Sequence, residues 1–585
     1  MALFLSPPKL VLLAVHLAVK ADIDSLASLA AHHGSVLRKD LLLRILLTYL
    51  PETLRSNDYV TLIEHIERGD FSSESQQLDH TTETETQQQQ QKQHEIDISS
   101  VESLTEEEAI KKVKKLRLLP LSSSLEAAPS AVEVAADDTT SLFLLRRSYK
   151  VDEEAGLLTE LPALLTPFLD HSPAIRWLLV STILPLLRRN CEYYPHEPIP
   201  YTLAAFQRLP DRTIANMLLS QTGAREEDYG LIGRDLKGII APWMLDKKRW
   251  RKGGQQSDLA EESTTTATDG DENPCPGWDQ VLRWLTSNAS KNWRVAANAF
   301  DQWEGPQSVD LGGIWVGGDE CQLNDEQRRH LDWTYAQAAL ASTYLVSVAS
   351  VEALEGAYAI LNRAVVVTNQ DPLPPLHNAA GLLAPLAEQV DGIVASPKNA
   401  TYLRNDLLES SNVLTWPTET STAFCQALVI SAFILTRAGA PCTLRRVGEL
   451  ALLQDEREQK AEALKLIHAL ANQGPKTDDK FWMKARDEIL WLRDWGAEDA
   501  WGATDSRPKG IFSQLNKEFL EVEFLKALLT NSRYALAKSI YEDSIERPLD
   551  EKVLKDAVFS TAMTAYDNAS NPNRTRGGLK KCDDM

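Results

Sequence analysis

The sequence is short of cysteine, and none of its cysteines has the close spacing of a metal or redox motif. Six are scattered through 585 residues: Cys191, Cys275, Cys321, Cys425, Cys442 and Cys582. Unpaired thiols in so long a chain favour a reduced, cytosolic protein over a disulfide-bonded secreted one. Four N-glycosylation sequons are therefore interpreted as chance occurrences. They begin at Asn288, Asn399, Asn568 and Asn573.

Long apolar runs are also lacking. The best stretches, residues 177–187 and 424–435, are shorter than the roughly 18 to 20 residues that a membrane span requires. Residues 10–19 could pass for the apolar core of a signal peptide, but Pro7-Pro8 is typical of a helix start, and further helical pattern follows directly. We therefore expect neither a transmembrane segment nor a signal peptide.

No motif of a common enzyme or cofactor site is found. The 11 histidines form neither an HExxH motif nor a Cys-His ligand set, and His16, inside an apolar segment, is interpreted as a packed core residue. The glycine-rich loop 312–318 lacks the P-loop Lys-Ser/Thr and the GxGxxG spacing, so a flexible connection is favoured over a phosphate cradle. We nominate no catalytic, cofactor-binding or metal-binding residue and expect a protein that is not an enzyme.

Positive charge is in deficit. With 83 acidic and 61 basic residues, the formal net charge is −22, which repels nucleic-acid phosphates and anionic lipid headgroups. We expect no nucleic-acid partner. The basic cluster at residues 247–252 (KKRWRK) is open to three interpretations: a phosphoinositide contact, a nuclear-import signal or, the favoured one, a solvated helix end. The basic residues within 111–117 are open to the same interpretations.

What the sequence does contain is helical hairpins. Residues 10–50 form three short segments that are separated only by two-residue breaks. Apolar residues recur three and four positions apart, as in Leu26, Leu29 and Ala30, which places them on one face of a helix. Each such face must be covered by a neighbouring helix. We therefore predict an all-α fold, an elongated α-solenoid of degenerate helical hairpins with disordered polar insertions.

Changes of composition divide the chain into six predicted parts. They are N-terminal helical hairpins at residues 1–69, a mostly disordered insertion with one short helix at 70–140, a helical solenoid at 141–252, a disordered acidic and polar loop at 253–276, a continuation of the solenoid at 277–566 and a polar tail at 567–585. The tail is interpreted as a loop at which a longer solenoid could be truncated, because solenoids normally end in a polar-faced capping repeat.

Several individual helices are predicted. Thr105 should cap a helix over residues 105–119, with acids in the first turn and bases near the end. Residues 326–364 read as one long helical stretch, and residues 444–471 and 512–542 as helix pairs.

Prolines and tryptophans also have predicted roles. The many prolines of residues 141–250 should mark helix boundaries, because a proline inside a helix costs about 3 kcal/mol. The closely spaced Trp278, Trp284, Trp293 and Trp303 are predicted to pack in the core.

Four stretches resemble a known family. They are LSPPKLVLLAVHLA from Leu5, LRKDLLLRILLTYLPE from Leu37, HSPAIRWLLVSTILPLLRRNCEYYP from His171 and LPDRTIANMLLSQTGAREEDYGLIGRDLKGIIAPW from Leu209. Together they resemble the fungal secretory-pathway family Sec-thirty-nine (Sec39), which is related to the metazoan neuroblastoma-amplified sequence protein. The resemblance covers the chain apart from its low-complexity insertions.

This resemblance implies a function that composition and periodicity do not. Members of the family are α-solenoid subunits of the Dsl vesicle-tethering complex, which captures COPI vesicles in Golgi-to-ER retrograde transport. The chain would bind the other tethering-complex subunits and the N-terminal helices of ER SNAREs through an acidic or apolar groove. It would lie in the cytoplasm, peripheral on the cytosolic face of the endoplasmic reticulum, and reach the membrane through these partners.

Two other function classes remain open from the residues alone. One is a solenoid scaffold of another assembly, of the coat, proteasome or nuclear-pore type, because stacked hairpins serve all of these. The other is an enzyme of unrecognised type, which would require titratable groups clustered in one cleft.

Overall fold

The computed structural model describes residues 5–69, 96–121, 137–246, 249–250, 275–314, 323–475, 477–497, 509–545, 547–569, 574 and 577–585. All regular elements in these ranges are helices, without a strand. The predicted all-α fold is therefore confirmed. Most of the two predicted insertions, at residues 70–95, 122–136 and 251–274, lies outside the described residues.

Contacts between Cα atoms divide the chain into two compact units. The first comprises Met1–Thr222, Arg234–Gln280 and Val309–Asn324. The second comprises Gly223–Gly233, Val281–Ser308 and Asp325–Met585. Two helices, α13 (Ile232–Asp235) and α15 (Pro276–Lys291), have residues in both units.

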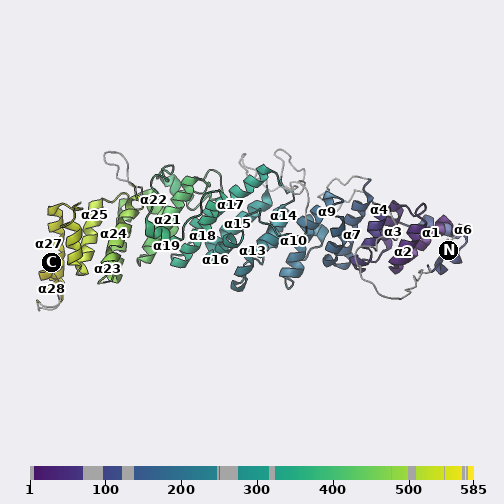
Figure 1. The fold of residues 1–585 in the computed structure, drawn as a ribbon, viewed down its shortest axis with the longest axis horizontal. Helices are drawn as coiled ribbons and strands as arrows, with labels where there is room; N and C mark the ends of the chain where they lie inside the picture. The colour runs from purple at the N-terminus through teal and green to yellow at the C-terminus, as the bar shows by residue number, and fades with distance from the viewer. Residues whose placement is uncertain are drawn as a thin grey trace, which may run out of the picture. The chain divides into compact units, whose positions relative to one another are not determined.

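The first unit contains most of the short helices. They are α1 (Pro7–Lys20), α2 (Ile23–His32), α3 (Lys39–Tyr49), α4 (Val60–Arg68), α5 (Ser99–Glu102), α6 (Glu106–Lys115), α7 (Thr139–Ala155), α8 (Leu161–Leu165), α9 (Pro173–Leu178), α10 (Leu184–Leu187), α11 (Leu203–Gln207), α12 (Asp211–Leu219) and α14 (Ala241–Met244). Successive helices lie side by side in Figure 1. In this unit α1 contacts α2 and α3, and α3 contacts α7, the neighbour-to-neighbour packing of a solenoid.

The three predicted segments at the N-terminus are confirmed as α1, α2 and α3. The break after α1 is made by Ala21, whose φ of 56° places it in the left-handed region that ends helices. Asp22 then caps α2 by accepting a hydrogen bond from the Ser25 amide, 3.2 Å away. Leu26 and Leu29 of α2 are fully buried, as their spacing predicts. Local sequence therefore sets both the bounds and the buried face of this hairpin.

Two prolines in the first unit do not mark a boundary. Most prolines of residues 141–250 lie in first turns or connections, as predicted, but Pro185 lies inside a helical run from Pro173 to Tyr193. A π-helical turn, Leu179–Ile183, ends two residues before it. Proline removes one helix hydrogen bond and crowds the carbonyl four residues earlier, and the wider π turn gives it room. Pro242 likewise follows a π-helical turn, Leu236–Ile240.

The second unit is built from longer helices. They are α16 (Trp293–Gln302), α17 (Asp325–Leu345), α18 (Val351–Val367), α19 (Leu376–Leu382), α20 (Pro397–Tyr402), α21 (Glu419–Arg437), α22 (Leu444–Leu453), α23 (Glu456–Gln473), α24 (Asp479–Asp494), α25 (Lys517–Thr530), α26 (Tyr534–Tyr541), α27 (Glu551–Asp567) and α28 (Gly577–Asp584). Alternate helices touch, α16 with α18 and α25 with α27, while α17 and α18 also touch as a hairpin. This two-layer stacking confirms a solenoid of hairpins.

One predicted long helix of this unit is instead a hairpin. Residues 326–364 contain α17 and α18, which are separated by Val346–Ser350. The Ser350 hydroxyl accepts a hydrogen bond from the Ala353 amide at 3.2 Å and so begins a second helix. The helix pairs predicted at 444–471 and 512–542 are confirmed as α22–α23 and α25–α26.

The predicted aromatic core is confirmed in part. Trp278 and Trp303 are fully buried. Trp284 and Trp293 are only half-buried, although Trp293 packs so closely on α18 that a Cβ on Gly356 would lie 2.5 Å from its ring. All four side chains therefore pack, but two of them at the rim of the core.

Helix α21 is the one helix in the described part of the chain that is long and apolar enough to cross a membrane. It has 19 residues and is longer than the apolar run at residues 424–435, because neighbouring polar residues also belong to the helix. Of its apolar window, 78% is buried within the structure. It contacts α18, α19 and α22, so it is a central core helix of the second unit.

Candidate interaction surfaces

The start of the glycine-rich loop lies against a buried arginine. Arg188, from the helical run that contains Pro185, donates hydrogen bonds to the carbonyls of Gly238 (2.7 Å) and Asp310 (2.6 Å). Gly312 has φ 63°, and a Cβ there would lie 2.9 Å from Arg188 Nη2. Its amide already donates to the Asp310 carboxylate at 2.8 Å. The Gly312 amide is therefore already engaged by a carboxylate of the chain itself. The rest of the loop, residues 315–318, lies outside the described residues.

The described part of the basic cluster points inward. Arg249 donates to the Asp211 carboxylate at 2.8 Å and to the Trp243 carbonyl at 2.9 Å. Its guanidinium carbon lies 4.2 Å from the centre of the Trp243 ring. Arg249 is therefore a packing residue of the first unit, not a solvated cation. Residues 247–248 and 251–252 lie outside the described residues.

The cysteines that the structure places inside the units are unreactive. Cys275, Cys425 and Cys442 are buried, and burial raises the pKa of each thiol to about 12. A thiolate is the nucleophilic and metal-binding form, so these side chains are inert near neutral pH. Cys191 is exposed, and burial of part of its thiol, together with nearby carboxylates, raises its pKa as well.

The histidines of the described ranges belong to no metal-binding group. No group of three or more His, Cys, Asp or Glu side chains that could hold a metal ion is found there. His16, predicted to be a packed core residue, is only half-buried.

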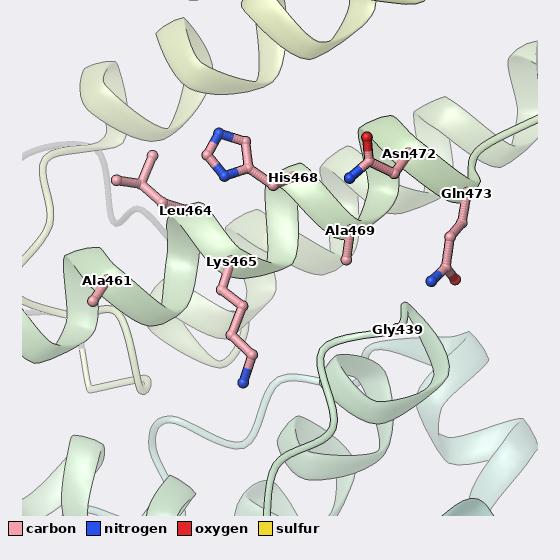
Figure 2. Close-up of a pocket in the computed structure, with 8 residues that line it drawn as sticks. All are labelled: Gly439, Ala461, Leu464, Lys465, His468, Ala469, Asn472 and Gln473. Atoms are coloured by element: carbon pink, nitrogen blue, oxygen red, sulfur yellow. The ribbon is translucent and has the colours of Figure 1, made fainter.

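A shallow groove follows one side of α23 in the second unit. Its cavity volume is about 500 Å³. Figure 2 shows Lys465 and Gln473 on the side of α23 that faces the turn at Gly439, and His468 on the opposite side. Gly439 has φ 85°, a left-handed backbone conformation that favours glycine, and a Cβ there would lie 2.6 Å from the Gln473 side-chain amide. The lining mixes polar with apolar side chains, and its Lys465 pairs with Glu462 at 3.0 Å.

A second groove, in the first unit, lies between residues 197–200 and α12. Its volume is about 460 Å³. Arg189 holds its wall by donating to the Glu197 carbonyl at 2.9 Å and to the Ser220 hydroxyl at 3.0 Å. The Ile199 amide donates to Asn190 at 2.8 Å. This groove is lined mainly by neutral and apolar side chains: Pro198, Ile199, Pro200, Thr213, Asn216, Met217 and Gln221.

A buried carboxylate lies near this groove but does not line it. Asp235 is almost fully buried and accepts hydrogen bonds from Thr222 at 3.0 Å, from Arg234 at 2.9 Å and from the Tyr194 hydroxyl. Burial raises the pKa of Asp235, and the hydrogen bonds from Tyr194 and Arg234 act against that rise. All these partners are structural groups of the chain, so the arrangement ties helices together and leaves no open position for a substrate.

An exposed apolar row runs along α27. Phe559, Met563 and Tyr566 are 68%, 40% and 55% exposed, and Ala557 is the only residue of α27 that is buried. Their spacing of four and three residues puts them on one helix face. Helix α28 packs on α27 without covering them. We call these three residues the α27 row; sequence spacing places them together, but only the fold shows that the row is uncovered.

Stacked hairpins with grooves and an uncovered helix face define a helical-repeat protein whose surfaces suit protein partners. Comparison with known protein families identifies the particular family within this class. The family model described as "Secretory pathway protein Sec39" matches residues 11–585, and the chain belongs to this family. A search of curated proteins found no match.

Proposed function

We propose that the chain is a non-catalytic subunit of an ER-associated multisubunit tethering complex. In this role it captures COPI vesicles in Golgi-to-ER retrograde transport and binds ER SNAREs, while partners hold it on the cytosolic face of the endoplasmic reticulum. The observation that carries the proposal is the match of a secretory-pathway family to residues 11–585, combined with the stacked hairpins of both units.

The described surfaces support a binding role. Both grooves are open and shallow, and neither gathers several titratable side chains. The most buried carboxylate near them, Asp235, is closed off by its own hydrogen bonds. Enzymes need a substrate pocket with convergent reactive groups, whereas protein partners bind shallow grooves and helix faces.

The α27 row supports binding of a partner helix. An amphipathic helix presents apolar side chains at the same three- and four-residue spacing, so it can lie along Phe559, Met563 and Tyr566. The family resemblance implies helical partners of this chain, the N-terminal helices of ER SNAREs. We therefore assign SNARE binding to the α27 row as part of the proposal.

Co-purification from detergent-solubilised membranes, read by mass spectrometry, tests both statements. The wild-type chain as bait should recover the other tether subunits together with ER SNAREs. A variant with Phe559→Ser, Met563→Ser and Tyr566→Ser should lose the SNAREs and keep the tether subunits. Leu382→Ser with Val394→Ser is a matched control, because these side chains are 71% and 69% exposed elsewhere in the second unit.

Three outcomes would contradict the proposal. Recovery of a coat, proteasome or nuclear-pore assembly would identify a scaffold of another kind. Recovery of neither tether subunits nor SNAREs would reject tethering. Equal loss of SNAREs in the α27 variant and in the control would reject the α27 row as their binding site.

A further inference from the structure

The helix α6 is held firmly on the first unit. Thr105 and Glu108 form a capping box, in which the Glu108 amide donates to the Thr105 hydroxyl at 3.4 Å and the Thr105 amide to the Glu108 carboxylate at 3.0 Å. Ala109 is fully buried and α6 contacts α1. The Ser6 hydroxyl donates to Glu106 at 2.5 Å. Two of the three acids in the first turn are therefore engaged in hydrogen bonds that fix the helix.

The other end of α6 carries a concentration of positive charge. All five cations are exposed: Lys111, Lys112, Lys114, Lys115 and Arg117. Lys112 lies near the Glu108 carboxylate and lowers its pKa, after the larger effect of the hydrogen bonds from Thr105. We call these five residues the α6 ridge. Lysines at a helix C-terminus usually complement the helix dipole, but the dipole amounts to only about half a charge, so it does not account for five cations.

The surroundings of the α6 ridge suit a flat surface. Figure 1 places α6 at the end of the first unit, beside α1. The four lysines lie in the C-terminal half of α6, and Arg117 lies just beyond the helix end. None of them lines the two grooves described above, which lie on α12 and α23. Ile110 and Leu119, beside the cations, are 38% and 39% exposed. Apolar side chains next to lysines are typical of helices that lie at a lipid interface.

We propose that the α6 ridge binds directly to the surface of a membrane that contains anionic lipids. Four of its five cations are lysines, which attract headgroups as point charges without the paired geometry of an arginine site. The chain as a whole is acidic, with a net charge of −22, but charges beyond about 8 Å are screened at physiological salt. The ridge therefore acts locally and fixes which end of the first unit meets the lipid.

Vesicle flotation of the full-length chain tests this proposal. Wild-type protein should float with vesicles of equimolar phosphatidylcholine and phosphatidylserine but not with phosphatidylcholine alone, and added salt should release it. A variant with Lys111→Gln, Lys114→Gln and Lys115→Gln should bind the anionic vesicles at least about tenfold more weakly than wild type. The side chains are exposed, so its circular dichroism and thermal midpoint should match wild type.

A matched control changes the net charge equally elsewhere. Lys480→Gln, Lys517→Gln and Lys552→Gln alter three exposed lysines of the second unit and should leave flotation unchanged. The proposal is overturned if the wild-type chain does not float with anionic vesicles. It is also overturned if both variants lose binding equally. No tether subunit or SNARE is present in this assay, so its failure leaves the proposed tethering function intact.

Discussion

At the scale of single residues, buried polar side chains hold the stack together. Arg147 of α7 is fully buried and donates to the carbonyls of Leu50 (2.8 Å) and Pro51 (2.6 Å). Its guanidinium also lies over the Tyr59 ring. It thereby ties α7 to the segment that follows α3. A buried arginine such as Arg147 is tolerated because its guanidinium nitrogens have hydrogen-bond partners.

A second such group spans three helices of the second unit. Glu521 of α25, 1% exposed, accepts hydrogen bonds from Arg486 of α24 (2.9 Å) and from the Tyr541 hydroxyl of α26 (2.7 Å). Glu521→Ala should lower the free energy of unfolding by about 3 kcal/mol, because it leaves the partly buried Arg486 cation and the buried Tyr541 hydroxyl without their shared partner. Urea denaturation measures the change.

An exposed ion pair is the control for this substitution. Glu458 pairs with Arg446, and these side chains are 55% and 35% exposed. Glu458→Ala should cost less than about 1 kcal/mol, because water screens such pairs. Equal losses in the two variants would contradict the role assigned to Glu521.

Thiol labelling tests the burial of the cysteines. Cys275, Cys425 and Cys442 should resist N-ethylmaleimide in the native protein and react after denaturation, because burial both blocks access and keeps the thiols protonated. Cys191, which is exposed, should react first. Peptide mapping by mass spectrometry reads each site, and rapid native labelling of Cys425 would contradict the packing of α21.

At the scale of helices, a cluster of charged side chains around Glu67 joins α3, α4 and α7. Glu67 of α4 accepts a hydrogen bond from Lys39 of α3 at 2.7 Å and one from Thr140 of α7. His171 lies between two carboxylates, with Nε2 2.9 Å from Asp138 and Nδ1 3.3 Å from Glu67. Burial raises the pKa of both carboxyls, but hydrogen bonds to Glu67 and to Asp138 outweigh it, and both pKa values are lowered.

This cluster predicts a loss of stability in acid. A carboxyl whose pKa is lower in the folded than in the unfolded chain stabilises the fold above the unfolded pKa, and that stabilisation is lost as the pH falls through the folded pKa. The thermal midpoint of the first unit should therefore drop between about pH 5 and pH 3. Glu67→Gln should lower the midpoint at pH 7 and reduce its dependence on pH in this range. An unchanged pH dependence would exclude Glu67 as a main contributor.

The contact between the two proline-containing helical runs depends on glycine. Gly238, in the π-helical turn before α14, leaves room for the Tyr193 hydroxyl, which would lie 2.7 Å from an added Cβ. Gly238→Ala should destabilise the chain by about 1–3 kcal/mol through overpacking. Gly381→Ala in α19, where nothing lies within 4 Å, should be neutral or slightly stabilising. Thermal unfolding of the two variants compares them, and equal midpoints would contradict the packing argument.

At the scale of the whole molecule, stability is expected to be local. Helices of a solenoid contact mainly their neighbours, so each unit contributes its own interactions. Gly238→Ala should weaken hydrogen-exchange protection in the first unit, and Glu521→Ala should do so in the second. Equal loss of protection across both units in either variant would show a single cooperative structure instead.

The sequence by itself determined the helices, many of their bounds and the family. Periodicity, the Thr105 cap and the break after Thr530 are local features, because a helix is stabilised by residues three and four positions apart. Periodicity does not show which faces another helix covers. Leu520 and Phe524 of α25 are buried whereas Phe559 and Met563 of α27 are exposed, although both pairs have helical spacing. The sequence already placed the cations of the α6 ridge together, at residues 111–117. The tertiary structure alone decided which helix faces are covered, and with it the exposure of the α27 row, because burial depends on neighbours that are distant in the chain.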